Sequence, residues 1–336
     1  MKLKLSDYDK IIFDLDGVIT SELSYWYAAA LTAYELLVSY EHYGVAGIDR
    51  EWIRKQYKEV YNTVMCGGRT VRAVKRLGVN TNWDLCHIVF CVSKYLNPEL
   101  WGLDAEHFQS VCMFIENIDM KAPEIYDAIS GLVDQACPEY EEGHFKRSGD
   151  FFEKELNNLF DDWYLGCDEF EGLKEDEELL LAPKEIEKIL KNLSDKGIRL
   201  GVGTGRPKDE AETPLEKYGI YKYFDKNLVA TYDEIKNAEE ELKLSKPLAK
   251  PDPFVFLKAA LGEKHSDREI IDGNYTYDEL DRTLIVGDAL SDLLAANKGG
   301  FDFLAVLTGV EGENAMGMFE ENKADYILNS ILDMCE

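Results

Sequence analysis

The chain has 336 residues, 46% of them hydrophobic, so it can bury a sizeable core and is long enough for about two domains. Its 65 acidic and 37 basic side chains give a formal net charge of −28, which disfavours non-specific binding to nucleic acids or to anionic membranes. Seven cysteines without a C-x-x-C pair, a polar N-terminus and the lack of a membrane-length apolar segment predict a cytoplasmic protein with reduced thiols.

The first predicted strand, at about residues 10–14, ends in two acidic side chains, Asp14 and Asp16, and Gly17 follows them. Residues two apart in a strand point to the same face, and a chain that leaves the strand at Leu15 can turn Asp16 towards whatever Asp14 faces. Two carboxylates so close repel each other unless one is protonated or a cation neutralises them, and Mg²⁺ prefers such oxygen ligands. The same Asp-x-Asp-Gly pattern alone is also typical of an ordinary turn.

A long insertion separates this strand from the next strand of parallel type, which begins at Ile198. A crossover needs only one helix, so roughly 160 residues in its place indicate an inserted domain, which we expect to be all-helical and to span 21–182. The insertion contains a predicted turn, Gly67-Gly68-Arg69, in which Arg69 is a candidate substrate contact. The alternative is that Arg69 is simply an exposed arginine at the start of a helix. Apolar periodicity predicts its helices at 25–43, 51–64, 71–77, 83–96, 105–118, 123–135 and 150–160.

The pattern changes at Pro183, where helices and strands begin to alternate. This alternation predicts an α/β fold, a doubly wound, Rossmann-like parallel sheet, for a core domain made of residues 1–20 and 183–336. The predicted strands are 198–203, 228–231, 284–287 and 303–307, with a last short edge strand at 326–328. The predicted helices are 183–197, 208–218, 253–261 and 290–298.

Polar residues follow the end of the strand at 198–203. Thr204 offers a hydroxyl, and Gly205 offers a backbone N–H that no side chain covers. Arg206 comes next and has two readings, a contact with a phosphate group or an ion pair with an acidic residue of the core. A simple turn and a dinucleotide-binding loop are alternatives for this segment, but its glycine spacing is G-x-G-x-G and not G-x-G-x-x-G.

Three further charged residues, Lys250, Asp288 and Asp292, lie at the ends of predicted strands or the starts of predicted helices. Lys250 precedes a helix that Asp252 would cap and Pro253 would begin, with Lys246 as a nearby alternative. Asp288 follows the strand at 284–287, and Asp292 lies about one helical turn later, although aspartates also favour helix starts for their own sake. Because ligands bind outside the carboxyl ends of parallel strands, we expect these residues to converge.

These motifs, in this order and spacing, resemble the phosphatase-type members of the haloacid dehalogenase (HAD) superfamily. The resemblance covers residues about 8–20 and about 183–310, and the insertion is similar to a large helical C1-type cap. It implies a Mg²⁺-dependent phosphomonoester hydrolase that acts on a small phosphorylated metabolite through an aspartyl-phosphate intermediate. Phosphoryl transfer needs positioning and charge neutralisation above all, and a carboxylate nucleophile, a lysine and Mg²⁺ together meet that need.

The resemblance also implies a role for each residue. Asp14 is expected to be the nucleophile and Asp16 the general acid and base. Thr204 and the N–H of Gly205 are expected to hold the transferring phosphoryl group, and Lys250 to steady that group and the nucleophile. The expected metal site consists of Asp14, the backbone carbonyl of Asp16, Asp288 and Asp292.

Two other functions stay open. Residues 14–20 are similar to the first motif of β-phosphoglucomutases, which prefer Val at the position of Val18, but the insertion is longer than the cap of those mutases. A non-enzymatic HAD-fold binding protein is the other alternative, and the apparently complete catalytic set disfavours it. A dehalogenase is disfavoured because such enzymes lack the second aspartate, here Asp16. The sequence leaves the substrate and the oligomeric state open.

Overall fold

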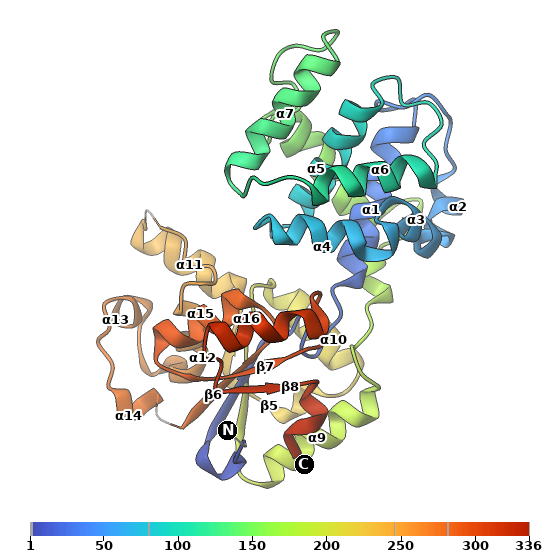
Figure 1. Ribbon diagram of the computed structural model, residues 1–336. Helices are drawn as coiled ribbons and strands as arrows, with labels where there is room; N and C mark the ends of the chain where they lie inside the picture. The colour runs from blue at the N-terminus through green and yellow to red at the C-terminus, as the bar shows by residue number, and fades with distance from the viewer. Residues whose placement is uncertain (1–2, 80, 245, 281, 336) are drawn as a thin grey trace. The chain divides into compact units, whose positions relative to one another are not determined.

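The computed structural model describes residues 3–79, 81–244, 246–280 and 282–335. The chain forms two compact units, a core unit of Met1–Ser21 with Glu178–Glu336 and a helical unit of Glu22–Glu177 (Figure 1). The helical unit is therefore slightly shorter at both ends than the insertion of 21–182 that the sequence predicts.

A six-stranded sheet forms the centre of the core unit, and all of its strand pairs are parallel. The order is β5-β4-β1-β6-β7-β8, so the chain builds outwards from β1 on one side and then on the other. The predicted doubly wound fold class is confirmed, and β1 stands at its topological switch point, where such sheets bind ligands. The strands are β1 Lys10–Phe13, β4 Arg199–Gly203, β5 Phe224–Ala230, β6 Thr283–Gly287, β7 Asp302–Val306 and β8 Tyr326–Leu328.

Both faces of this sheet are covered by helices, which explains why its strands read as continuous apolar runs. Ile11 and Phe13 point to one face, and Ile12 points to the other, as the two-residue period of a strand requires. The first face packs against α9 Pro183–Asp195 and α10 Lys208–Lys217. The second packs against α11 Tyr232–Leu242, α12 Phe254–Leu261, α13 Asp267–Ile271, α14 Tyr277–Leu280, α15 Leu290–Gly299 and α16 Met316–Glu321.

The helices of the core unit differ from the prediction in number and in where α12 begins. Helices α11, α13, α14 and α16 were not predicted, and α11 buries only two apolar side chains, so its periodicity is weak. Its clearer signal is the capping box between Thr231 and Glu234, in which each side chain binds the other's backbone. Helix α12 begins one residue after Pro253, and Asp252 accepts the backbone N–H of Phe254 at 3.0 Å.

The helical unit has one continuous apolar core, with the central helices α1 and α5 buried along most of their length. The single helix predicted at 51–64 is divided at Gln56, and a small antiparallel hairpin of β2 and β3 interrupts the expected all-helical pattern. Its elements are α1 Leu23–Val38, α2 Arg50–Lys55, α3 Tyr57–Val64, α4 Arg69–Arg76, α5 Asn82–Leu96, α6 Ala105–Glu116, α7 Glu124–Ala136, a π-helical turn Phe151–Leu156, α8 Asn157–Leu165, β2 Gly166–Cys167 and β3 Phe170–Glu171.

The two connections of the insertion lie side by side inside the core unit. The N–H of Ser21 donates to the carbonyl of Glu178 at 3.1 Å, and the N–H of Leu180 donates to the carbonyl of Ile19 at 3.0 Å. The chain therefore leaves and re-enters the core at one place. Within the described residues, no helix has the length and apolar character needed to cross a lipid bilayer.

Candidate active site

The centre of the site is Asp14, the first residue after β1. Its N–H continues the sheet by donating to the carbonyl of Val286 on β6 at 2.8 Å. On the other side of β1, Phe13 is in register with Val202 on β4. The ends of three neighbouring strands thus meet at Asp14, whose side chain is almost completely buried.

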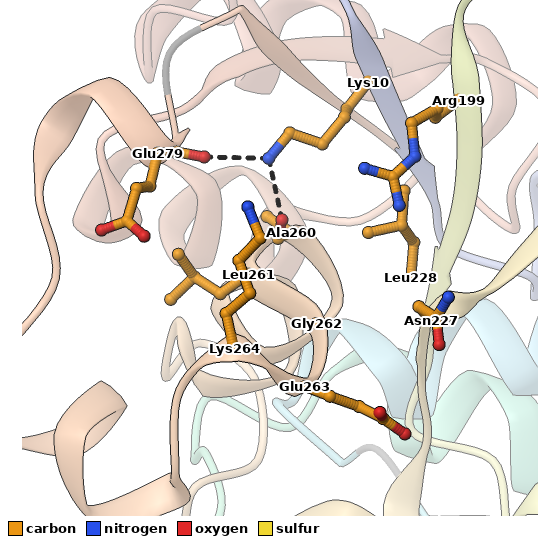
Figure 2. Close-up of a pocket in the computed structure, with 10 residues that line it drawn as sticks. All are labelled: Lys10, Arg199, Asn227, Leu228, Ala260, Leu261, Gly262, Glu263, Lys264 and Glu279. Carbon is orange, nitrogen blue, oxygen red and sulfur yellow. Dashed lines mark hydrogen bonds between the residues drawn. The ribbon is translucent and has the colours of Figure 1, made fainter.

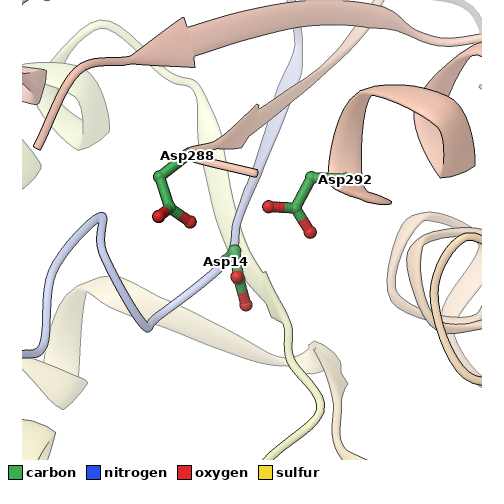
Figure 3. A group of neighbouring side chains, drawn as sticks. All are labelled: Asp14, Asp288 and Asp292. Atoms are coloured by element: carbon green, nitrogen blue, oxygen red, sulfur yellow. The ribbon is translucent and has the colours of Figure 1, made fainter. Parts of the chain in front are cut away.

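Three carboxylates come together at this sheet edge. Asp14 follows β1, Asp288 follows β6 and Asp292 lies in the first turn of α15, and one oxygen of each lies within 4.8 Å of the others. Figure 3 shows the three side chains gathered around one space. Asp292 also accepts the N–H of Ala289 at 3.2 Å, so the carboxylate that caps the helix belongs to the cluster as well.

Two glycines leave room for the carboxylate of Asp288, because a side chain at either position would collide with it. A Cβ atom on Gly17 would lie 2.1 Å from an oxygen of Asp288, and a Cβ atom on Gly309 would lie 1.9 Å from the same oxygen. Gly17 also has a φ of +71°, a left-handed conformation that costs other residues energy. Thr308 donates its hydroxyl to the carbonyl of Gly17 and joins the two turns. Thr308 and Gly309 were missed by sequence reasoning, although their position after β7 parallels that of Thr204 and Gly205 after β4.

Lys250 is the cation of the cluster. Its Nζ lies 3.0 Å from Oδ1 of Asp14 and 2.8 Å from Oδ1 of Asp292, and it stands 4.6 Å from the ring centroid of Phe256. Burial acts to lower the pKa of Lys250, but the charges of Asp14 and Asp292 outweigh burial and raise the pKa above its ordinary value. The ammonium group therefore stays charged.

One lysine does not balance the acidic cluster. Burial raises the pKa of Asp14 to about 7, Lys250 works against this shift, and the charges of Asp292 and Asp16 add to it. The cluster places three carboxylates, those of Asp14, Asp288 and Asp292, beside a single lysine. Its donors are all hard oxygens, so the residues fit a divalent cation such as Mg²⁺.

Asp16 and Arg206 form an ion pair across the site. Nε of Arg206 lies 3.0 Å from both carboxylate oxygens of Asp16, and Nη1 donates to the carbonyl of Glu210 at 3.2 Å. The guanidinium group is buried, whereas the side chain of Asp16 is 27% exposed. Arg206 therefore pairs with Asp16, and its predicted contact with a phosphate group stays a prediction.

Thr204 and Gly205 stand at the end of β4, next to β1. Thr204 is buried, donates its N–H to the carbonyl of Ala230 at 3.0 Å and accepts the N–H of Arg206 at its hydroxyl oxygen at 3.3 Å. A Cβ atom on Gly205 would meet nothing within 4 Å, so its backbone faces open space. This geometry is compatible with binding an oxyanion, and the phosphate-binding role of both residues stays a prediction.

Arg69 belongs to the helical unit, at the start of α4. Its Nε donates to Oε1 of Glu116 at 2.7 Å, and Nη2 contacts the other carboxylate oxygen. Its predicted contact with substrate stays a prediction.

Comparisons with known proteins found a family model, a curated relative and a solved structure that this chain is similar to. The model of a family described as haloacid dehalogenase-like hydrolases matches residues 8–300. The pyrophosphatase PpaX of Halalkalibacterium halodurans is 25% identical over 158 residues, 47% of this chain, and the match spans 60% of that relative's length. A crystal structure from the Northeast Structural Genomics Consortium has a TM-score of 0.81 and 27% sequence identity, with 97% of each chain covered.

Proposed function

The chain belongs to the haloacid dehalogenase-like hydrolase family, and we propose that it is a Mg²⁺-dependent phosphatase that hydrolyses a small phosphorylated metabolite in the cytoplasm. The observation that carries the proposal is the convergence of Asp14, Lys250, Asp288 and Asp292 at the switch point of the sheet. Carboxylates and a lysine at such a place suit the transfer of a phosphoryl group, because the reaction depends on charge neutralisation and alignment.

The metal site in this proposal consists of the carboxylates of Asp14, Asp288 and Asp292 with the backbone carbonyl of Asp16. When bound there, Mg²⁺ would offset the negative charge of the phosphoryl group. Asp292 already binds Lys250 and the N–H of Ala289, so it positions Lys250 whether or not it also binds the metal directly.

In the first step, a carboxylate oxygen of Asp14 attacks phosphorus, an aspartyl-phosphate forms and the alkoxide of the substrate leaves. Lys250, in contact with Oδ1 of Asp14, reduces the repulsion between the carboxylate and the approaching anion. The hydroxyl of Thr204 and the N–H of Gly205 hold the phosphoryl oxygens in line for the attack.

Asp16 supplies the proton transfers. In its protonated form it donates a proton to the leaving alkoxide, and as a carboxylate it then accepts a proton from the water that hydrolyses the aspartyl-phosphate. Arg206 holds both oxygens of the ionised form, which is the form needed in the second step.

The first test is hydrolysis of a panel of phosphomonoesters, with and without Mg²⁺. Pyrophosphate belongs in the panel because the relative from Halalkalibacterium halodurans is named a pyrophosphatase. EDTA should abolish turnover, and added Mg²⁺ should restore it. Asp14→Asn should lower kcat by at least about 10³-fold, because an amide is a poor nucleophile. Hydrolysis that persists in EDTA and in the Asp14→Asn variant would contradict the proposal. Release of inorganic phosphate, and not of an isomeric sugar phosphate, separates a phosphatase from a phosphomutase.

The second test follows the covalent intermediate. Asp16→Asn keeps the backbone carbonyl proposed for the metal but loses the group that accepts the proton of water. With p-nitrophenyl phosphate, whose leaving group needs little acid help, the variant should accumulate a phosphorylated chain that intact-mass spectrometry detects after rapid quenching. Equal slowing of both steps for activated and unactivated esters would contradict the dual role of Asp16.

A further inference from the structure

A second polar pocket lies at the other end of the core sheet from Asp14. It has a volume of about 370 Å³, and it opens where β1 and β4 begin (Figure 2). Lys10 is the first residue of β1 and Asp14 follows its last, so at 3.3 Å per residue the two lie about 13 Å apart. The pocket is thus distinct from the carboxylate cluster.

Three cationic side chains line this pocket, although the chain carries a net charge of −28. They come from separate elements: Lys10 from β1, Arg199 from β4 and Lys264 from the turn after α12. In Figure 2 the ammonium groups of Lys10 and Lys264 point towards one another. Burial lowers the pKa of Lys10, and the charges of Arg199 and Lys264 lower the pKa further.

These cationic side chains have N–H groups that are not all used in hydrogen bonds within the protein. Nζ of Lys10 gives hydrogen bonds to the carbonyls of Ala260 at 2.8 Å and Glu279 at 2.9 Å, and an ammonium group has a third N–H. Arg199 donates hydrogen bonds from Nε and Nη2 to the carboxylate of Asp225. Lys264 is exposed and forms no ion pair with any residue in the described part of the chain.

Arg199 is paired with Asp225, which does not line the pocket, whereas the two carboxylates that do line it, Glu263 and Glu279, form no ion pair with Lys10, Arg199 or Lys264 in the described part of the chain. Glu279 points away from Lys10 in Figure 2 and binds His265 at 2.9 Å and the N–H of Thr276 at 2.9 Å. The hydrogen bond from His265, followed by that from Thr276, lowers the pKa of Glu279 to about 2, which shows that its charge is already engaged. Glu263 is exposed at the opposite rim, next to Asn227.

We propose that this pocket is a binding site for a small phosphate-type anion, held by Lys10, Arg199 and Lys264, with the side-chain amide of Asn227 as a further donor. Cations from three elements around one hollow match the several oxygens of a phosphate group. The proposed catalytic function is not needed for this inference, because none of these residues takes part in the carboxylate cluster. An occupant would contact Lys10 at the start of β1, the strand whose other end leads to Asp14.

Isothermal titration calorimetry of the full chain with inorganic phosphate, in EDTA, tests the site. Without Mg²⁺ the catalytic cluster keeps three carboxylates against one lysine and repels phosphate, so the remaining binding reports on the second pocket. We expect one equivalent of phosphate per chain, with an affinity that falls as salt is added.

Substitutions at the rim of the pocket test whether phosphate binds there. Lys264→Glu should weaken phosphate binding by about tenfold or more, Asn227→Asp should weaken it too, and Lys264→Arg should keep it within about twofold. Lys188→Glu is the matched control, because Lys188 is exposed on α9 of the same unit and away from the pocket. Circular dichroism melting establishes that each variant folds. Absence of binding by the wild type, or equal binding by Lys264→Glu and Lys188→Glu, would overturn the inference and leave the catalytic proposal untouched.

Discussion

Arg206 joins two motifs that lie 190 positions apart in the chain. Its guanidinium group is buried, contacts both oxygens of Asp16 and is anchored to the carbonyl of Glu210. A buried arginine that binds one carboxylate in this way restricts where that carboxylate can point. We infer that Arg206 is a positioning residue for Asp16.

Replacing Arg206 should therefore impair the step in which Asp16 accepts a proton. Arg206→Gln should lower kcat about 10- to 100-fold with a smaller change in KM, and phosphorylated chain should accumulate with p-nitrophenyl phosphate. Arg206→Lys keeps the charge and should recover part of the rate. A loss that appears only in KM would instead indicate that Arg206 binds the phosphate of the substrate.

His42 takes part in a partly buried charge network within the helical unit. Its Nδ1 lies 2.8 Å from Glu155, and its Nε2 lies 3.8 Å from Glu35, which also accepts the indole N–H of Trp163 at 2.9 Å. The hydrogen bond to Glu155 and then that to Glu35 raise the pKa of His42 to about 9, against burial, which acts to lower it. Arg50 is the second cation beside Glu35, at 3.3 Å.

This network predicts how stability depends on pH. Because the pKa of His42 is higher in the folded chain than its value of 6.5 when unfolded, its contribution is complete below pH 6.5 and is lost as pH rises through about 9. The contribution is at most about 3 kcal/mol, so Tm should fall by several degrees between pH 6.5 and 9.5. His42→Gln should melt lower than the wild type at pH 6.5 and converge with it at pH 9.5. A constant gap between the two melting curves would show that protonated His42 does not stabilise the fold.

The turn after β1 is the element that brings the acidic residues together. Asp14 ends the strand, Gly17 lies against Asp288 in a left-handed conformation, and the carbonyl of Gly17 accepts the hydroxyl of Thr308. A turn with a side chain at position 17 cannot approach Asp288 so closely. The local conformation of one glycine therefore sets the geometry of the proposed metal site.

Gly17→Ala should weaken activation by Mg²⁺ about 10- to 100-fold, because the new methyl group displaces the carboxylate of Asp288. Gly219→Ala is the matched control, since Gly219 has a φ of +69° and a Cβ atom there would meet nothing within 4 Å. The control should cost about 1 kcal/mol of stability and leave Mg²⁺ activation unchanged. If the two variants behave alike, backbone strain and not the contact with Asp288 is responsible.

For the molecule as a whole, the two segments that connect the insertion to the core unit lie next to each other. Hydrogen bonds between residues 19–21 and 178–180 fasten the two connecting segments to each other within the core unit. The core unit and the helical unit each have their own apolar clusters. We therefore propose that the chain consists of a core domain and an inserted cap domain.

Replacing residues 22–177 by a short Gly-Ser linker should leave a core that folds, because the linker has to join only two neighbouring chain ends. Cooperative melting followed by circular dichroism checks this. The shortened chain should retain some Mg²⁺-dependent hydrolysis of p-nitrophenyl phosphate and lose discrimination among natural esters, since caps exclude water and select substrates. A chain that shows no cooperative transition would mean that the core unit depends on the insertion.

Much of the core could be predicted because local patterns carry the information. Strands β1, β4 and β6 are buried on both faces and read as short apolar runs, and Asp14, Thr204 and Asp288 follow them directly. Strand β5 was predicted too short because, at the edge of the sheet, its first half carries the polar residues 225–227, none of which is buried. Helix α11 was missed for a related reason, since a helix with little buried surface has little periodicity.

Local sequence patterns were sufficient to predict the class of fold, an insertion after the first strand and acidic residues at strand ends, because such patterns involve residues that are close together in the chain. The folded chain was needed to find which groups meet: Arg206 with Asp16, Lys250 between Asp14 and Asp292, and the cations of the second pocket. These partners lie far apart in the chain. Their contacts depend on strand order and register, which arise from packing the whole sheet and not from any local pattern.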